Sequence, residues 1–352
     1  MCWLVSVACV SSPEPQPTLS DGVVTLRAWR DEDIEAAIAG HDEEIAHWFG
    51  FPQVRPSYER HKEAVDAWHR AYAEGRSVVA FVIEADGEVV GSIDVRDVGE
   101  HTGEITWAVY AGHRRRGYAT RAARLVADYA LGELGYTRVQ AKVEPENTRS
   151  TRVATRSGML REGIRRVNPG SGDRTETTQY AVYARLRDDP PIDTPESFRA
   201  LLNSFLPRKR AIAQMLVRDE QARVLLCQLT YKRDWDLPGG VVEVDESPQQ
   251  AVSREVAEEL SIDIKAGPLL LTDWLPPWSG WDDALCLVFD GGATSPAVLD
   301  DAVLEAREIR SAQFCTLDEV RERCADFTAR RVEAALRMLD GGGSTYTESG
   351  RA

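Results

Sequence analysis

The sequence predicts two α/β domains, each built around its own sheet. The chain has 352 residues, more than one typical domain holds, so its length alone favours two domains. Apolar runs of strand length alternate with stretches of helical spacing in both halves, as in mixed α/β folds. Between the halves, residues 188–195 are rich in proline and aspartate, a composition typical of a stiff, extended linker.

Composition narrows the classes of function. Apolar residues make up 43% of the chain and charged residues 28%, as in globular proteins, and the net charge is −15. An acidic chain of this kind binds nucleic acid and membrane surfaces poorly, and no segment has the ~20 apolar residues of a membrane span. Cys227 and Cys286 stand in apolar runs and are expected to be buried free thiols. We therefore expect a cytoplasmic protein without nucleic-acid or membrane partners.

Both chain ends are expected to be disordered. The apolar start of residues 1–17 lacks the positive charge of a signal peptide, so we interpret this segment as a disordered tail. Residues 341–352 are polar and rich in glycine, and we interpret them in the same way.

The elements of the first domain follow from apolar periodicity. A strand is expected at 23–27 and a helix start at the acidic run 30–33. Strands at 78–83 and 88–95 flank Asp86-Gly87, a pair typical of hairpin turns. A strand at 104–111 leads through the turn 114–120 to a helix from Arg121 to about Leu134. A further strand and helix are predicted at 135–143 and 147–157.

The turn Arg114-Arg115-Arg116-Gly117-Tyr118-Ala119-Thr120 suits an anion. The unpaired N–H groups and the dipole of a helix N-terminus favour negative charge, and Gly117 lets the backbone approach a ligand closely. By itself the pattern also fits an exposed basic turn. Together with Asn147-Thr148-Arg149-Ser150, Gly158-Met159 and Glu162-Gly163, it resembles the acetyl-CoA-binding pattern of the GNAT N-acetyltransferase superfamily, in particular its RimJ/RimL-like branch.

This resemblance implies a GNAT domain over residues 18–187, with acetyl-CoA as cofactor and a primary amine of a protein N-terminus or small molecule as acceptor. Many members place a tyrosine general acid where this chain has Ala154. Ser150 is then either the proton donor to the CoA thiolate or a helix-surface serine. Glu104 accepts the amine proton directly or through water. The residues implied in cofactor binding are Val109, Arg114, Arg116, Gly117, Tyr118, Ala119, Thr120 and Asn147.

The second domain is expected at 207–340, after a linker at 188–206. Residues 196–205 predict a short helix that packs ahead of the second domain's strands. The apolar runs 211–217 and 223–229 predict a hairpin. Later strands and helices are expected at 269–272, 284–289, 317–324 and 328–339.

Three carboxylates share one face of a predicted helix. Glu255, Glu258 and Glu259 stand at positions i, i+3 and i+4, which lie about 5–6 Å apart on a helix. Three like charges so close oppose the helix unless a cation lies among them, and a hard cation such as Mg²⁺ or Mn²⁺ prefers oxygen ligands. The alternative interpretation is a solvated acidic face.

The flanking residues favour the metal site. Gly240, Glu246 and the run 254–259 have the spacing of the Nudix box, so this segment resembles the Nudix hydrolase superfamily at every fixed position except Ser261. The family has glycine there, where the helix closes in a left-handed conformation and serine costs about 1 kcal/mol. The resemblance implies a Nudix α/β/α sandwich.

The Nudix resemblance also implies roles for single residues. Glu258 and Glu259 are metal ligands, with the Gly239 carbonyl beside them. Glu255 is either a further ligand or the base for the attacking water, and Arg254 and Glu246 form an orienting ion pair. Glu308 and Glu305 are alternative candidates for a further acidic group from a later loop. The implied substrate is a nucleoside diphosphate linked to another group, hydrolysed with Mg²⁺ or Mn²⁺.

Two other functions remain open at this level. The first domain could be a non-catalytic acyl-CoA-binding regulatory module beside an active Nudix hydrolase. The whole chain could instead be a nucleotide-sensing regulator with an inert Nudix fold, although its retained carboxylates favour catalysis.

Overall fold

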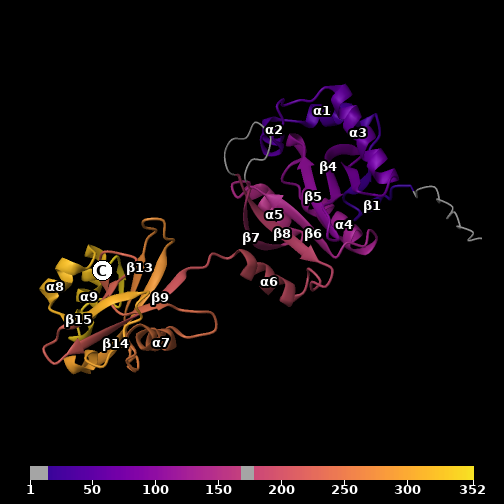
Figure 1. Cartoon of the computed structure of the whole chain (residues 1–352). Helices are drawn as coiled ribbons and strands as arrows, with labels where there is room; N and C mark the ends of the chain where they lie inside the picture. Colours follow the sequence, from indigo (N-terminus) through magenta and orange to yellow (C-terminus); the bar gives the residue numbers. More distant parts are fainter. Residues whose placement is uncertain (1–14, 168–177) are drawn as a thin grey trace, which may run out of the picture. The chain divides into compact units, whose positions relative to one another are not determined.

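The computed structural model describes residues 15–167 and 178–352 (Figure 1). The chain divides into two compact units, Met1–Leu206 and Pro207–Ala352. Each unit holds its own sheet and its own apolar clusters, which confirms the two predicted α/β domains. Within the described part of the chain, no helix combines the length and apolar character needed to cross a membrane.

The first unit is a single sheet flanked by helices, with strand order β1-β2-β3-β4-β5-β6-β8-β7. Its strands are β1 (Leu19–Ser20), β2 (Thr25–Ala28), β3 (Val78–Ala85), β4 (Glu88–Asp97), β5 (Thr102–Val109), β6 (Arg138–Val143), β7 (Leu160–Val167) and β8 (Thr178–Leu186). Its helices are α1 (Asp33–Gly40), α2 (Glu43–Phe49), α3 (Tyr58–Ala73), α4 (Tyr118–Gly132), α5 (Thr148–Arg156) and α6 (Pro195–Phe205), with the 3-10 turn η1 (Ala111–His113).

The predicted hairpin of this unit is confirmed. Strands β3 and β4 pair from Val78↔Arg96 to Ala85↔Glu88, and Asp86 and Gly87 between them have φ 53° and 79°. Two positive φ values in succession are the turn that Asp-Gly favours. One face of this sheet packs on α4 and α5, and the helices inserted between β2 and β3 cover part of the other.

The linker prediction for 188–206 is partly wrong. Helix α6 packs on β7 of the first unit, where the Ser204 hydroxyl accepts a hydrogen bond from the Arg161 N–H at 3.1 Å. Ile192 lies so close to Gly158 that a Cβ there would come within 2.6 Å of its side chain. Ile192 and α6 therefore lie against the domain that precedes them, although Phe198 remains 59% exposed, and the boundary between the units falls after Leu206.

Separation of the chain after Leu206 should yield two folded fragments. We expect 1–206 and 207–352 each to unfold cooperatively on heating, because each retains its complete sheet and clusters. A cut after Asp188 should leave a less stable first fragment, since it removes Ile192 and α6. Circular dichroism melts of the three fragments measure this. Aggregation of both fragments cut at 206 would contradict the two-unit description.

The second unit has strand order β11-β10-β9-β14-β13-β16, with β12 on β9 and β15 on β10. Its strands are β9 (Arg210–Asp219), β10 (Val224–Leu229), β11 (Trp235–Asp236), β12 (Gly239–Val241), β13 (Leu269–Leu275), β14 (Ala284–Thr294), β15 (Ile309–Cys315) and β16 (Tyr346–Glu348). Its helices are α7 (Pro248–Leu260), α8 (Leu317–Arg323) and α9 (Asp326–Leu339), with the 3-10 turn η2 (Pro296–Leu299).

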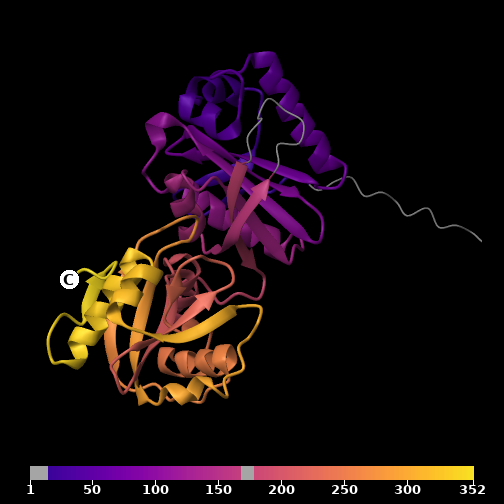
Figure 2. The same cartoon turned by 60° about the vertical axis from the view of Figure 1, so that its left-hand side comes forward.

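Alternation along β9 places this sheet between two helical layers. Met215 and Val217 pack in the cluster that includes α7 residues, whereas Leu216 packs in the cluster of α8 and α9. Figure 2 shows α7 in orange and the later helices in yellow on different sides of the strands. The predicted α/β/α sandwich is confirmed.

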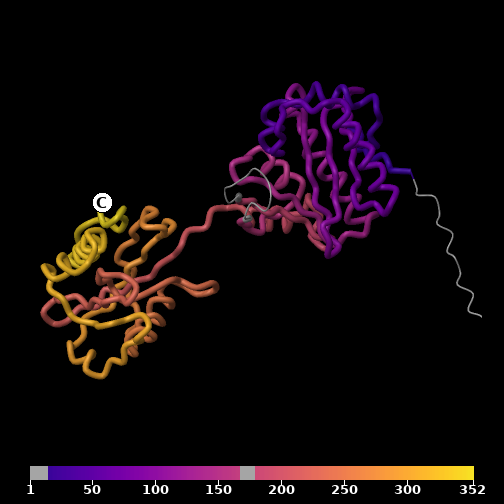
Figure 3. Tube along the Cα trace, turned by 45° about the horizontal axis from the view of Figure 1, so that its top comes forward, coloured from indigo at the N-terminus to yellow at the C-terminus, as the bar shows by residue number. Residues whose placement is uncertain are grey.

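The tail predictions need correction. Residues 1–14 lie outside the described part of the chain, but residues 15–17 belong to the first unit, since the Gln16 side-chain N–H donates to the Ala80 carbonyl at 2.8 Å. The C-terminal stretch is ordered: β16 pairs in parallel with β13, and the trace ends beside α9 (Figure 3). The predicted disorder of 341–352 is therefore wrong.

Candidate active sites

The first candidate site opens where two parallel strands part. Strands β5 and β6 pair only from Thr102↔Arg138 to Glu104↔Gln140, although both run on beyond this point. A cavity of about 900 Å³ is lined by residues 105–109 of β5 and 141–143 of β6. Because these facing edges form no ladder with each other, their backbone groups are available to a ligand that carries amides.

The basic turn closes one end of this cavity. Gly117 has φ 84° and is the N-cap of α4, which begins at Tyr118, three residues earlier than predicted. No side chain caps the helix, so its first N–H groups remain available to an anion. All eight residues implied in cofactor binding line the cavity: Val109, Arg114, Arg116, Gly117, Tyr118, Ala119, Thr120 and Asn147.

Arg114 contributes differently from the expectation. Its Nε donates to the Val109 carbonyl at 2.9 Å, and its terminal nitrogens donate to the carboxylates of Asp42 and Glu44 at 2.7–2.8 Å. The Arg114 guanidinium holds the pKa of Asp42 below its usual range. The side chain therefore joins the turn to α2 and has its guanidinium engaged by two carboxylates.

Of the two residues predicted to act in acetyl transfer, Ser150 lines the cavity and Glu104 does not. Ser150 lines the cavity, and its backbone N–H donates to the Asn147 side chain that caps α5 at 3.0 Å. Glu104 is not among the lining residues: its carboxylate pairs with Lys142 at 2.6 Å and accepts from Gln140 at 2.9 Å. Lys142 lines the cavity, whereas Glu104 does not. Glu104 is therefore next to a residue of the cavity wall but is not itself part of that wall.

Helix α2 supplies a wall that the sequence analysis missed. Glu44, Ile45, Trp48 and Phe49 line the cavity, and Glu44 also accepts from Arg149 at 2.6 Å. The available signal was the acidic run before α2, in which Asp42 accepts a hydrogen bond from the Ile45 N–H as an N-cap.

The second candidate site is built on α7. A capping box of Ser247 and Gln250, with Pro248 in the first turn, starts this helix. Ser261 ends it at φ 56°, as predicted for the position where the family has glycine, and its hydroxyl donates to the Val303 carbonyl. The helix thus has fixed ends, which set the register of its acidic face.

Arg254 gathers the carboxylates around it. It pairs with Glu246 at 2.8 Å, the contact implied by the resemblance, and holds the pKa of that carboxyl below its usual range. It also pairs with Glu255 at 3.1 Å and with Glu258 at 2.8 Å. The Glu258 side chain is 60% exposed, so of the three acidic residues on α7 it is the freest to turn.

Glu259 is buried against the glycine loop. Its Oε2 accepts the Gly239 N–H at 3.0 Å, and a Cβ on Gly240 would lie within 2.7 Å of the Glu255 carboxylate. Burial, together with the nearby charges of Glu255 and Glu308, raises the pKa of Glu259 to about 8, against the lowering effect of the Gly239 N–H. Of the two alternative loop residues, Glu308 lies near enough for its charge to affect Glu259, and the Glu305 backbone N–H donates to the Glu259 carbonyl at 2.9 Å. The Glu305 carboxylate accepts from the Arg307 N–H instead.

The donor set fits a hard divalent cation. Buried oxygens that repel one another are stabilised when such an ion neutralises them. Within residues 15–167 and 178–352, no three His, Cys, Asp or Glu side chains stand close enough to hold a metal in their present rotamers. In the present rotamers the Glu258 carboxylate is paired with Arg254. Rotation of this exposed side chain would offer a further metal ligand.

Each of the two units matches a different protein family. Residues 24–160 match the family model of the acetyltransferase (GNAT) domain, and residues 207–336 match that of the NUDIX domain. The second unit is similar to a MutT-like protein of Streptomyces ambofaciens, with 34% identity over 137 residues, 38% of this chain and 78% of that protein.

Two further comparisons concern the first unit. The uncharacterized N-acetyltransferase YnaD of Bacillus subtilis is 35% identical over 85 residues, 24% of this chain and 50% of YnaD, so the chain spans half the length of that relative. RimJ of Mycobacterium smegmatis, solved with CoA-disulfide, is 22% identical with a TM-score of 0.44, covering 53% of this chain and 94% of RimJ. The two family models show that the chain carries a GNAT acetyltransferase domain followed by a NUDIX domain, and the Streptomyces relative shows that it belongs to the Nudix family.

Proposed function

We propose that the protein is bifunctional, an acetyl-CoA-dependent N-acetyltransferase joined to a Nudix hydrolase that uses Mg²⁺ or Mn²⁺. The proposed acetyl acceptor is a primary amine of a protein N-terminus or a small molecule. The proposed hydrolase substrate is a nucleoside diphosphate linked to another group. Each half of the proposal rests on one arrangement of residues.

For the acetyltransferase, that arrangement is the cavity between β5 and β6 with the α4 N-terminus at its end. The parted strands offer backbone donors and acceptors to the amide-bearing arm of CoA, and the N–H groups after Gly117 suit its diphosphate. With acetyl-CoA bound, acetyl transfer would form a C–N bond to the amine and break the C–S bond, while the amine loses one proton and the CoA thiolate gains one. Ser150, which lines the same cavity, is the proposed donor of that proton.

Two observations favour the alternative of a binding module. Ala154 stands at the tyrosine position, and Glu104 is paired with Lys142 and is not among the residues that line the cavity. If Glu104 is the base, the amine proton must reach it through an intervening group such as water. A chain that binds CoA without acetylating any amine would have this same cavity.

For the hydrolase, the arrangement is the buried Glu259 against the Gly239 N–H, with the Glu255 carboxylate beside Gly240. Mg²⁺, when bound, neutralises the diphosphate and lowers the pKa of the attacking water. Glu259 and Glu258 are the proposed ligands with the Gly239 carbonyl, and Glu255 is either a ligand or the base. Arg254 orients this face through its ion pairs with Glu246 and Glu255.

The full chain should show both activities in separate assays. With acetyl-CoA and a panel of N-terminal peptides and small primary amines, we expect amine-dependent release of the CoA thiol. With Mg²⁺ we expect hydrolysis of at least one of ADP-ribose, nucleoside triphosphates, dinucleoside polyphosphates and nucleotide sugars, abolished by EDTA. CoA binding without thiol release would favour the binding module. Absence of all hydrolysis with either metal would favour the inert Nudix fold.

A further inference from the structure

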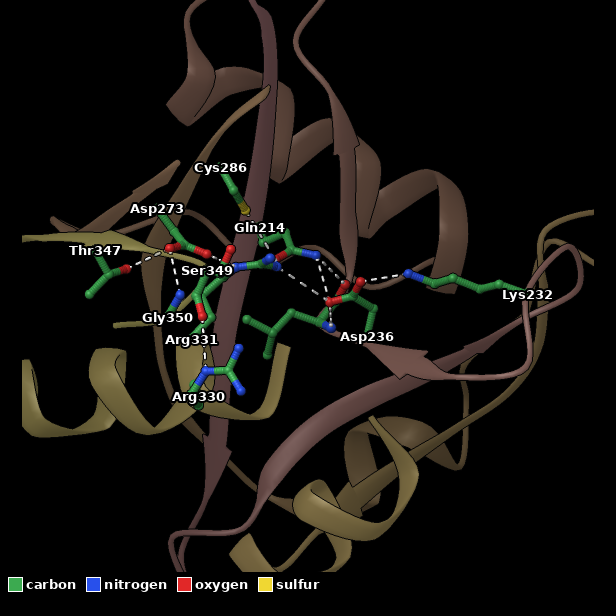
Figure 4. Close-up of polar contacts among 11 residues, drawn as sticks. Gln214, Lys232, Asp236, Asp273, Cys286, Arg330, Arg331, Thr347, Ser349 and Gly350 are labelled. Carbon is green, nitrogen blue, oxygen red and sulfur yellow. Dashed lines mark hydrogen bonds and ion pairs between the residues drawn. The ribbon is translucent and has the colours of Figure 1, made fainter. Parts of the chain in front are cut away.

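An ion pair is buried in the core of the Nudix domain. Asp273 on β13 is 0% exposed and Arg331 on α9 is 1% exposed, and the Arg331 Nε donates to Asp273 Oδ2 at 2.8 Å (Figure 4). A buried pair stabilises a structure only when its remaining donors and acceptors are also satisfied. The other carboxylate oxygen, Asp273 Oδ1, accepts from the Thr347 hydroxyl at 2.7 Å and from the Gly350 N–H at 2.8 Å.

Both of these donors come from the last residues of the chain, Ser344–Arg351, which we call the C-terminal strap. Its strand β16 pairs with β13 from Thr272↔Tyr346 to Trp274↔Glu348. Gly350, at φ 72°, lies so close to α9 that a Cβ there would come within 2.5–2.6 Å of Arg330 Cβ and of the Arg331 backbone nitrogen. The strap is therefore seated by backbone pairing, by one glycine and by two hydrogen bonds to a buried carboxylate.

The other end of the network reaches the metal loop. Arg331 Nη1 donates to Gln214 Oε1 at 2.8 Å, and Gln214 Nε2 donates to Asp236 Oδ1 at 2.9 Å. Asp236 Oδ1 also accepts the Leu237 N–H, which begins the short segment that delivers Gly239 to Glu259. A continuous series of hydrogen bonds thus runs from the strap to the glycine loop (Figure 4).

Few contacts fix the orientation of the central guanidinium. Arg331 Nη2 is buried and has no hydrogen-bond partner among the described residues. The guanidinium is held by its hydrogen bonds to Asp273 and Gln214, by an ion pair with Asp236 at 3.9 Å and by the Phe327 ring, whose centroid lies 5.8 Å away. Loss of the strap would leave Asp273 Oδ1 without its two donors, and an unsatisfied buried acceptor forces its neighbours to rearrange or admit water.

We propose that the C-terminal strap is a positioning device for the Nudix metal site. Thr347 and Gly350 fix Asp273 and Arg331, and these act through Gln214 and Asp236 to hold the Gly239 loop against Glu259. This inference rests on the proposed hydrolase function and adds the residues that support its site from outside. Thr347, Asp273, Arg331 and Gln214 are accordingly positioning residues, not catalytic ones.

The test compares Mn²⁺ affinity in full-length variants, measured from the free-Mn²⁺ signal in electron paramagnetic resonance. In Thr347→Val/Gly350→Ala the hydroxyl is lost and a Cβ is placed against α9, so the strap is unseated. We expect its Mn²⁺ dissociation constant to rise, and kcat to fall, about tenfold, as when groups that support metal ligands are removed. We expect the substrate KM to change less than twofold, and CoA binding by the first domain to be unchanged.

Two variants act as matched controls. Tyr346→Ala changes an exposed side chain of the same strand, and Thr347→Ser keeps the hydroxyl, so both should bind Mn²⁺ as wild type does. Wild-type affinity in the double variant would overturn the positioning role alone. Failure of the wild type to bind Mn²⁺ would overturn the metal site and the strap's role together. If the double variant does not fold, Thr347→Val alone decides by the same criterion, because it preserves the shape of the side chain.

Discussion

Glu259→Gln should abolish most Mg²⁺-dependent hydrolysis while leaving the Nudix domain folded. The amide oxygen of the introduced glutamine can still accept the Gly239 N–H, so the glycine loop keeps its anchor. The negative charge that a metal requires is lost. Removing groups that merely support metal ligands costs about 10–100-fold, so loss of a ligand should reduce kcat at least about a hundredfold. Steady-state rates on the substrate found in the screen measure this.

The same variant should change the pH dependence of stability in EDTA. Burial raises the folded-state pKa of Glu259 from the usual 4.5 to about 8, so the folded state prefers the protonated carboxyl. The wild type is therefore expected to lose stability as pH rises from about 4.5 to about 8. Glutamine cannot ionise, so Glu259→Gln should lack this component and melt above the wild type at pH 8 without metal.

A matched control tests whether the loss of any nearby carboxylate has the same effect as the loss of Glu259. Glu305 is an exposed residue of the neighbouring loop, and its carboxylate accepts the Arg307 N–H of the same loop. The variant Glu305→Gln should therefore hydrolyse the substrate at the wild-type rate. Wild-type rates in Glu259→Gln would remove the metal-ligand assignment.

The features that sequence predicted well depend on neighbouring residues. Asp86-Gly87 forms its turn because the two residues that need positive φ are adjacent. Helix α7 ends at a left-handed residue, as predicted for Ser261, and it holds Glu255, Glu258 and Glu259 at positions i, i+3 and i+4. In these places the interactions that stabilise the structure lie within a few residues of one another, so the pattern is visible in the chain.

The features that could not be predicted from the sequence depend on residues far away in the chain. The end of the chain is polar and rich in glycine, which favours disorder, yet Thr347 and Gly350 are fixed by a buried carboxylate 74 and 77 residues earlier. Glu104 was assigned a role from its strand, but Lys142 and Gln140 on the adjacent strand take up its carboxylate. The residues next to Asp273 and Glu104 in the sequence form no pattern that predicts these contacts.

Gly117→Val should weaken CoA binding to the first domain at least about tenfold, or 1.4 kcal/mol. Gly117 has φ 84°, a conformation that strains a β-branched residue. Among the described residues, and leaving out its two chain neighbours, no atom lies within 4 Å of a Cβ built at this position. A Cβ at this position therefore projects into open space beside the N-terminus of α4. That space is where the proposed diphosphate must approach the first N–H groups of the helix. Isothermal titration with CoA measures the loss.

Strain and obstruction can be separated with a second glycine. Gly135 has φ 79° and equally open surroundings, but it does not line the cavity between β5 and β6. Gly135→Val should therefore suffer the same backbone strain and a similar loss of thermal stability, while it binds CoA as wild type does. If both variants lose CoA affinity equally, the effect arises from strain in the fold. If neither loses it, the turn before α4 is an exposed basic loop and the cofactor lies elsewhere. Loss in Gly117→Val alone would support the assignment of the CoA diphosphate to the N-terminus of α4.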